Sequence, residues 1–141
     1  MRFKDTIGIS HLITGVENRM RTALDAALSR LQMSLAQYSA LSALEMQTQP
    51  LTNADLARAC GVTPQTMNRI VSALLRSRML SKVEAEHGLK VFYQLTPLAL
   101  KRLCSAHEAV DAIERESLRG LKPVEYKALQ QSLRAMQQNL E

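Results

Sequence analysis

Residues 51–80 read LTNADLARACGVTPQTMNRIVSALLRSRML, and the architecture of the chain can be worked out from this stretch. Thr52 and Asp55 form a capping box, the pair of side chains that begins a helix. Gly61 is the residue type best suited to the left-handed conformation in which many helices end. Thr63 and Pro64 then fit the N-cap and the first position of a second helix. Two short helices joined by a tight turn form a helix-turn-helix, which we predict here.

The second of these helices has one apolar and one polar face. The apolar positions, spaced three and four apart, are Met67, Ile70, Val71, Leu74 and Leu75. The polar positions are Gln65, Asn68, Arg69, Ser72 and Arg76, and no Asp or Glu occurs between Thr63 and Arg78. Gln and Asn amides pair with adenine, and Arg pairs with guanine or phosphate, so this face is suited to the major groove of DNA. The pattern alone leaves open a capped helix pair with a solvated polar face.

A change of period after residue 80 predicts a β-hairpin. Apolar and other residues alternate from Leu89 to Leu95, which is typical of a strand, and residues 80–85 provide its partner. Residues 86–88 form the tip. A helix-turn-helix followed by a hairpin is the element order of a winged helix, which favours DNA binding over the alternative.

Helices are predicted on both sides of this region. An apolar stripe marks residues 5–31, Ser34 and Gln37 form a second capping box before residues 34–46, and Thr96-Pro97 begins a helix that ends near Arg119. The last helix starts at Pro123 and carries a heptad-like seam of Tyr126, Leu129, Leu133, Met136 and Leu140. We therefore expect a mainly α protein with a small β-hairpin wing, an α+β fold.

Composition limits the function classes. The chain has 141 residues, 46% hydrophobic and 4% aromatic, with a net charge of +5, which is compatible with a polyanionic partner. Two cysteines do not make a disulfide scaffold, and no apolar run is long enough for a membrane helix. No signal peptide is apparent at the N-terminus, so we expect a cytoplasmic protein without a membrane partner.

The chain resembles the MarR family of transcriptional regulators. The resemblance rests on the helix at 34–46, on residues 51–80 and on the hairpin ending in YQLTPLALKRL, and it covers nearly the whole length. It implies a single domain over 1–141, with dimerisation helices at 5–33 and 97–141 and a winged helix-turn-helix at 34–96. It also implies a homodimer that binds pseudo-palindromic double-stranded DNA, as a ligand- or stress-responsive repressor. The apolar stripes on the first and last helices agree, because a chain of this size offers them few partners of its own.

The resemblance also assigns DNA-binding residues. They are Thr63, Gln65, Thr66, Asn68, Arg69 and Ser72 on the recognition helix, with Arg76 from its polar face, and Lys82, His87 and Lys90 in the wing. Two departures stand out. The acidic residue and Arg that the family places in the wing are replaced by His87 and Leu89, and Arg78 stands where Gly is common. A winged-helix dimer that has lost DNA contacts and binds protein is therefore the alternative function.

Other chemistry has little support in the sequence. Cys60 and Cys104 are expected to be buried, and Cys104 with His107 supplies too few ligands for a zinc site. We find no catalytic motif, so we predict no enzyme activity, no cofactor and no metal. The resemblance implies a small aromatic or phenolic effector, for which His11, Arg19 and Tyr38 are candidate contacts.

Overall fold

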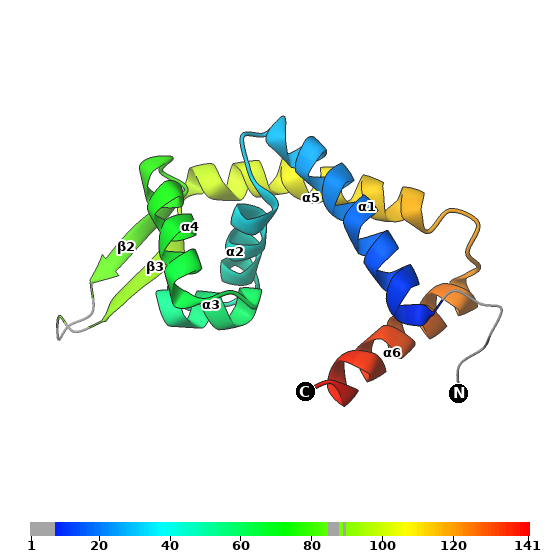
Figure 1. Cartoon of the computed structure of the whole chain (residues 1–141). Coiled ribbons are helices and arrows are strands. Elements are labelled where there is room, and N and C mark those ends of the chain that lie inside the picture. The colour runs from blue at the N-terminus through cyan, green and yellow to red at the C-terminus, as the bar shows by residue number, and fades with distance from the viewer. Residues whose placement is uncertain (1–7, 85–87, 89) are drawn as a thin grey trace.

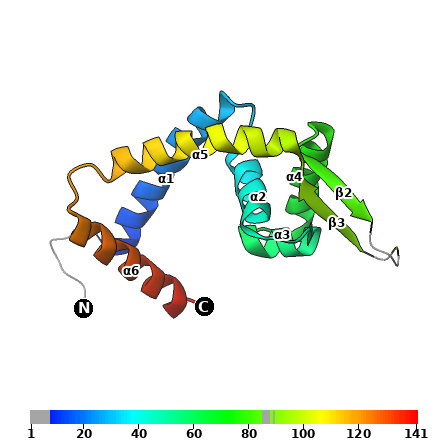
Figure 2. The same cartoon turned by 180° about the vertical axis from the view of Figure 1, so that it is seen from behind.

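The computed structural model describes residues 8–84, 88 and 90–141, and it has six helices and a small sheet in this part of the chain. The elements in order are α1 (Ile9–Ser29), α2 (Leu35–Met46), β1 (Leu51–Thr52), α3 (Asn53–Cys60), α4 (Pro64–Arg76), β2 (Leu80–Glu84), β3 (Val91–Leu95), α5 (Pro97–Ser117) and α6 (Pro123–Asn139). The long α5 runs along one edge of the molecule, with α2, α3, α4 and the sheet at its N-terminal end (Figure 1). Toward the other end, α1 crosses α5, and a loop connects the C-terminal end of α5 to α6. The view from behind shows the same arrangement (Figure 2). The fold is the predicted winged helix with additional helices at both ends.

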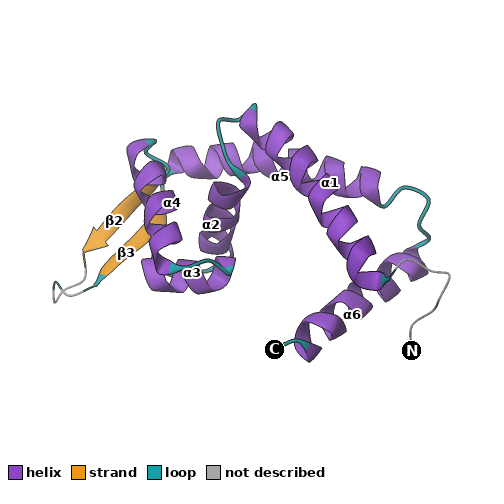
Figure 3. Cartoon of the chain, viewed as in Figure 1, coloured by secondary structure: helices purple, strands orange, loops and turns teal. Residues whose placement is uncertain are grey.

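The sheet differs from the sequence-based prediction, which had only a hairpin. It has three antiparallel strands in the order β1-β3-β2, because Leu51 pairs with Tyr93 and Thr52 with Phe92. The two longer strands, β2 and β3, are the ones labelled in Figure 3. The prediction of a two-stranded wing was therefore incomplete. A strand of two residues that also forms a helix N-cap has no alternating pattern by which it could be recognised.

The hydrophobic core lies between α2, α3, α4 and α5 and takes in the C-terminal end of α1. Its largest fully buried side chains are Leu28, Leu41, Leu56, Met67, Leu74 and Leu103. The predicted apolar face of α4 is confirmed at Met67, Val71 and Leu74, whereas Ile70 is half-buried. The core thus fixes which face of α4 remains outside.

The predicted helix starts are confirmed by their hydrogen bonds. Ser34 and Thr52 both form complete capping boxes, with Gln37 and Asp55 respectively. Thr96 caps α5 by accepting from the backbone N–H of Ala99 at 3.2 Å. The ends agree less closely, since α1 stops at Ser29 and α5 at Ser117, two residues before the predicted ends. The predictions for residues 5–7, 85–87 and 89 lie outside the described residues.

Two expectations about burial were wrong. Cys104 is exposed, whereas Cys60 is half-buried and its burial raises the pKa of its thiol. Val91, expected on the apolar side of its strand, is 49% exposed, while Tyr93 and Leu95 pack against the core. Among the described residues, no helix is long and apolar enough to cross a membrane.

Gly61 ends α3 in the left-handed conformation, with φ +66°. A Cβ at this position would meet no atom within 4 Å, so the effect of a substitution comes from the backbone alone. The left-handed conformation costs a residue with a Cβ about 1–2 kcal/mol, and removing a glycine recovers about 0.5–1 kcal/mol of chain entropy. We expect Gly61→Ala to lower the free energy of unfolding by about 0.5–1 kcal/mol in urea denaturation. Gly15→Ala, in the interior of α1 and equally unobstructed, should instead raise it.

Arg78 is the converse case, because it adopts a left-handed φ of +61° without being a glycine. Its carbonyl accepts a 2.7 Å hydrogen bond from the Thr96 hydroxyl, which ties the turn after α4 to the start of α5. The same balance of terms predicts that Arg78→Gly raises the free energy of unfolding by about 0.5–1 kcal/mol. Ser72→Gly, in the interior of α4, should lower it by roughly 0.5 kcal/mol. If both variants lost the same free energy of unfolding, the Arg78 side chain would have to stabilise the fold through a contact of its own.

Candidate nucleic-acid interface

The recognition helix α4 is held at its first turn by two side chains. The Thr63 hydroxyl accepts from the backbone N–H of Thr66 at 3.2 Å and donates to the Thr66 hydroxyl at 3.0 Å. The Asn53 side-chain N–H donates to the carbonyl of Pro64 at 3.1 Å, which joins the start of α3 to the start of α4. Asn53 therefore helps to set the angle between the two helices of the helix-turn-helix.

The outer face of α4 is free for a ligand. Its exposed residues are Gln65, Asn68, Arg69, Ser72 and Arg76. Within the described part of the chain, none of these side chains makes a hydrogen bond or ion pair with the protein. Their amide and guanidinium groups can therefore bind an external partner without breaking an internal contact. This is the arrangement that binding in the major groove requires.

The last acidic residue before this face in the sequence, Asp55, is already engaged. The backbone N–H of Thr52 donates to Asp55 at 3.0 Å, and this hydrogen bond is the main reason that the pKa of Asp55 is lowered. Arg58 forms a 2.6 Å ion pair with the same carboxylate. Asp55 thus stays ionised as a cap for α3, and its charge is offset by Arg58.

The wing presents fewer groups to a partner. Lys82 is exposed on β2 and is paired with Tyr93 on β3, and Lys90 is exposed immediately before β3. His87 lies outside the described residues. The wing therefore offers two lysines of the three residues that the sequence suggested.

Tyr38, a predicted effector contact, takes part in a hydrogen-bonded chain between α2 and α5. Its hydroxyl lies 2.8 Å from Nδ1 of His107, and Nε2 of His107 lies 3.2 Å from the Glu45 carboxylate. A carboxylate only accepts, so Nε2–H donates to Glu45 and the Tyr38 hydroxyl donates to Nδ1. Burial raises the pKa of the Tyr38 phenol, and the charges of Asp111, Glu114 and Glu45 add to this. The hydroxyl therefore remains a donor at neutral pH.

The other two effector candidates are separate from this chain of hydrogen bonds. His11 and Arg19 are exposed on α1 and do not line the apolar groove between α1 and α6. Both ring nitrogens of His107 are occupied, and the described residues contain no cluster of three or more potential metal ligands. His107 thus has a structural partner on each side.

Removing the Tyr38 hydroxyl tests the value of this link. Tyr38→Phe leaves His107 without its donor, and we expect the free energy of unfolding to fall by about 1 kcal/mol. Tyr93→Phe is a matched control, because the Tyr93 hydroxyl makes no hydrogen bond to another described residue. Urea denaturation of both variants measures the difference, and equal stability would mean that the hydrogen bond contributes nothing net.

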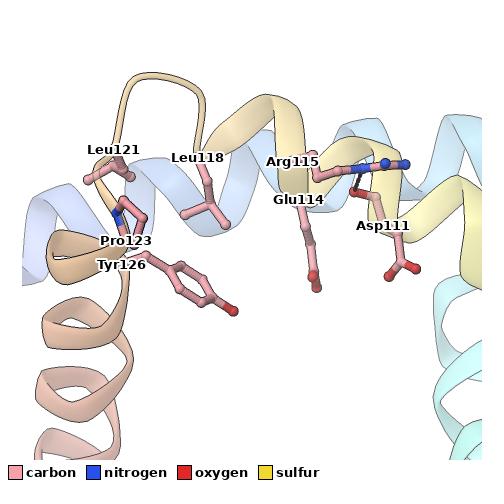
Figure 4. Close-up of a pocket in the computed structure, with 7 residues that line it drawn as sticks. All are labelled: Asp111, Glu114, Arg115, Leu118, Leu121, Pro123 and Tyr126. Atoms are coloured by element: carbon pink, nitrogen blue, oxygen red, sulfur yellow. Dashed lines mark hydrogen bonds between the residues drawn. The ribbon is translucent and has the colours of Figure 1, made fainter.

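A second cavity, of about 530 Å³, lies between the end of α5 and the start of α6 (Figure 4). The carboxylates of Asp111 and Glu114 and the Tyr126 ring point to the same side of α5, while Arg115 turns back and donates from Nε to the Asp111 carbonyl at 3.3 Å. This wall is acidic, so it is unsuited to DNA. The candidate nucleic-acid interface is therefore the exposed face of α4 together with the described lysines of the wing.

Comparisons with known proteins agree with this geometry. Residues 31–88 match the family model described as MarR family. The transcriptional regulator PA3341 is 25% identical, covers 94% of this chain and 98% of its own, and superposes with a TM-score of 0.83. MepR of Staphylococcus aureus, solved with DNA, is 21% identical over 95% of this chain and 97% of its own, with a TM-score of 0.84. CouR from Rhodococcus jostii RHA1, bound to p-coumaroyl-CoA, is 17% identical over 92% of this chain and 91% of its own, with a TM-score of 0.81. No curated protein sequence matches the chain significantly.

Fold and site together define a winged-helix DNA-binding protein. Residues 31–88 carry the sequence match to the MarR family, and the whole chain is similar in fold to MarR-family transcriptional regulators.

Sequence reasoning missed three residues that shape the site. Asn53 aligns α4, and Glu45 and His107 connect the winged-helix region to α5. Asn53 could have been noticed because it stands at the first position of a capped helix. The other two are 62 positions apart in sequence, and no local pattern connects them.

Proposed function

We propose that this chain is a homodimeric, sequence-specific repressor of the MarR family that binds pseudo-palindromic operators and releases them in response to a small ligand. The observation that carries the proposal is the outer face of α4, where five polar and cationic side chains are exposed and free of internal partners. The proposed location of the regulator is the cytoplasm, where it can reach the DNA.

The last helix supports the homodimer. The 17 residues of α6 include none that is buried within the single chain. An isolated helix of this length is marginal in water, so α6 needs a partner to cover its apolar side. With α1 it forms a groove of about 540 Å³ lined by Ile9, Leu12, Ile13, Val16, Met20, Leu24, Leu129, Leu133 and Met136, among others. A second copy has the same apolar helices to place there, and a twofold interface needs just such a self-complementary surface.

The proposed division of the chain follows from this. Residues 5–33 and 97–141 form the dimerisation region, and residues 34–96 form the DNA-binding region, within one domain over 1–141. The seam predicted for α6 agrees at Leu129, Leu133 and Met136, which line the groove, whereas Leu140 is 86% exposed at the end of the helix.

Each group on the DNA-binding surface has a role suited to its chemistry. Gln65, Asn68 and Arg69 lie nearest the start of α4 and contact base edges, as recognition helices do with their N-terminal residues. Thr63, Thr66 and Ser72 provide short hydroxyl contacts, and Arg76, Lys82, His87 and Lys90 contact phosphates. Without an Arg in the wing, sequence choice rests mainly on α4.

A ligand response is proposed because CouR has the same fold and binds p-coumaroyl-CoA, and DNA binding because MepR was solved with DNA. A small aromatic or phenolic effector is the class that we propose, with His11, Arg19 and Tyr38 as its candidate contacts. Because Tyr38 connects α2 to α5, a ligand that displaced its hydrogen bond to His107 would loosen the winged-helix region from the dimer helices.

Titration of labelled duplex fragments, including the DNA upstream of its own gene, tests the proposal at low and moderate salt. We expect tight binding to a subset of fragments and a steep loss of affinity with salt, because phosphate contacts release counterions. Absence of binding at low salt by a folded dimer would overturn the DNA-binding proposal. It would favour the alternative, a dimer that binds protein, which the altered wing at His87 and Leu89 supports.

A further inference from the structure

A basic cavity lies away from the DNA-binding surface, at the corner between α1 and α5. Its volume is about 410 Å³, and its lining includes Arg30 and Leu31 after α1 and Leu98, Lys101, Arg102 and Ser105 on α5. The α5 residues are spaced three and four apart, so they form one face of that helix. We call this group the α1–α5 basic cavity.

The positive charge of this cavity is not neutralised by the chain. No Asp or Glu is among the lining residues that the structure describes. In the same described part, Arg30, Lys101 and Arg102 take part in no ion pair and no side-chain hydrogen bond. Three like charges that converge from two elements repel one another and concentrate anions from solution. The three charges are therefore available to bind an anion from solution.

The helix dipoles alone would not make the electrostatic potential of this cavity positive. The first turn of α5 carries roughly +0.5 charge and the last turn of α1 roughly −0.5, so the two dipoles nearly cancel. At the end of α1, the Leu28 carbonyl already accepts hydrogen bonds from the N–H groups of Leu31 and Met33. The three formal charges therefore dominate.

The position of the cavity argues against a contact with the DNA that α4 binds. The α1–α5 corner lies at the top of the molecule in Figures 1 and 2, whereas α3 lies toward the bottom. Gln65 and Asn68 belong to the first turns of α4, which follows α3 directly, so a duplex bound there would lie away from this corner. The anion is thus more readily a small molecule than a backbone phosphate of that duplex.

The lining also indicates the class of ligand. Two guanidinium groups match the oxygens of phosphates in bidentate fashion, and a lysine adds a third charge. Leu31 is half-buried and Leu98 is 38% exposed, so one wall is apolar. A volume of about 410 Å³ is within the range of small-molecule sites and exceeds what a single phosphate needs. We propose that the α1–α5 basic cavity binds an organic phosphate with at least two negative charges.

Calorimetric titration of the full-length protein with inorganic pyrophosphate and with adenosine diphosphate, at constant ionic strength, tests the proposal. We expect saturable binding of both, tighter for the nucleotide because its organic part can contact the apolar wall. In the double variant Lys101→Gln/Arg102→Gln, the affinity should fall at least tenfold. The charge-conserving variant Lys101→Arg/Arg102→Lys should recover most of it.

A matched control removes the same two charges elsewhere. Lys127→Gln/Arg134→Gln lies on α6, where both side chains are exposed and unpaired among the described residues, and it should change the affinity less than twofold. An equal loss in this control would reduce the effect to general charge attraction and overturn the proposal. So would the absence of saturable binding by the folded wild-type protein. A Lys101→Gln/Arg102→Gln variant that binds pyrophosphate normally but shows a smaller salt dependence of DNA binding would assign the cavity to the duplex instead.

Discussion

The variant Leu133→Asp is expected to be monomeric and to bind a duplex with two half-sites at least about 100-fold more weakly than the wild-type protein. Leu133 is 40% exposed in the single chain and lines the groove between α1 and α6. In the proposed dimer this groove is closed by the second copy, and a buried unpaired carboxylate costs several kcal/mol. A monomer has one recognition helix, so it loses the gain of roughly 10²–10⁴ in affinity that a linked second site provides.

Light scattering after size-exclusion chromatography measures the first part of this prediction. The wild-type protein should elute with twice the chain mass of 15.7 kDa, and the variant with a single chain mass. Gln131→Asp is the matched control, because Gln131 is exposed on the same helix and does not line the groove. If Leu133→Asp retains both the dimer mass and full DNA affinity, the interface lies elsewhere.

The second large effect is expected from Arg69→Ala on the outer face of α4. An arginine contact to a base or phosphate is worth about 1–3 kcal/mol, a factor of roughly 5–150 in affinity, and a dimer loses it twice. If Arg69 contacts a base, the variant should lose its preference for the operator at that position. If it contacts phosphate, operator and non-operator DNA should weaken alike and the salt slope should fall by about 1 for each contact.

Fluorescence titration with operator and scrambled duplexes at several salt concentrations distinguishes these results. Arg119→Ala removes the same side chain from the turn after α5, where Arg119 is exposed and paired with Glu116 at 3.0 Å, and it should leave DNA affinity unchanged. Unaltered binding by Arg69→Ala would show that this face of α4 does not contact DNA.

The elements predicted most accurately are those whose determinants are local. The Thr52–Asp55 capping box, Gly61 and Thr63-Pro64 each specify a backbone conformation within a few residues, so the helix-turn-helix followed from the sequence. The polar face of α4 followed as well, because a strong helical period leaves one side outside whatever the rest of the chain does.

What could not be predicted depends on contacts between distant segments. The pairing of Leu51 with Tyr93 creates β1, and the contact of Tyr38 with His107 spans 69 positions. Cys104 was expected to be buried because of its residue type, yet the turn of α5 that carries it places Leu103 and Ala106 inside instead. Residue type gives only an average burial, and helix rotation decides the particular case.

Two hydrogen bonds that Thr96 donates have a mechanical consequence. Its backbone N–H donates to the Met79 carbonyl at 3.2 Å and its hydroxyl to the Arg78 carbonyl, so the end of the recognition helix is fastened to the start of α5. With 21 residues, α5 is a lever about 30 Å long. A tilt of only about 6° at its far end therefore displaces α4 by about 3 Å, close to the rise of one base pair along the duplex. In the proposed dimer, a tilt of a few degrees in the terminal helices would be enough to move the recognition helix out of register with its half-site.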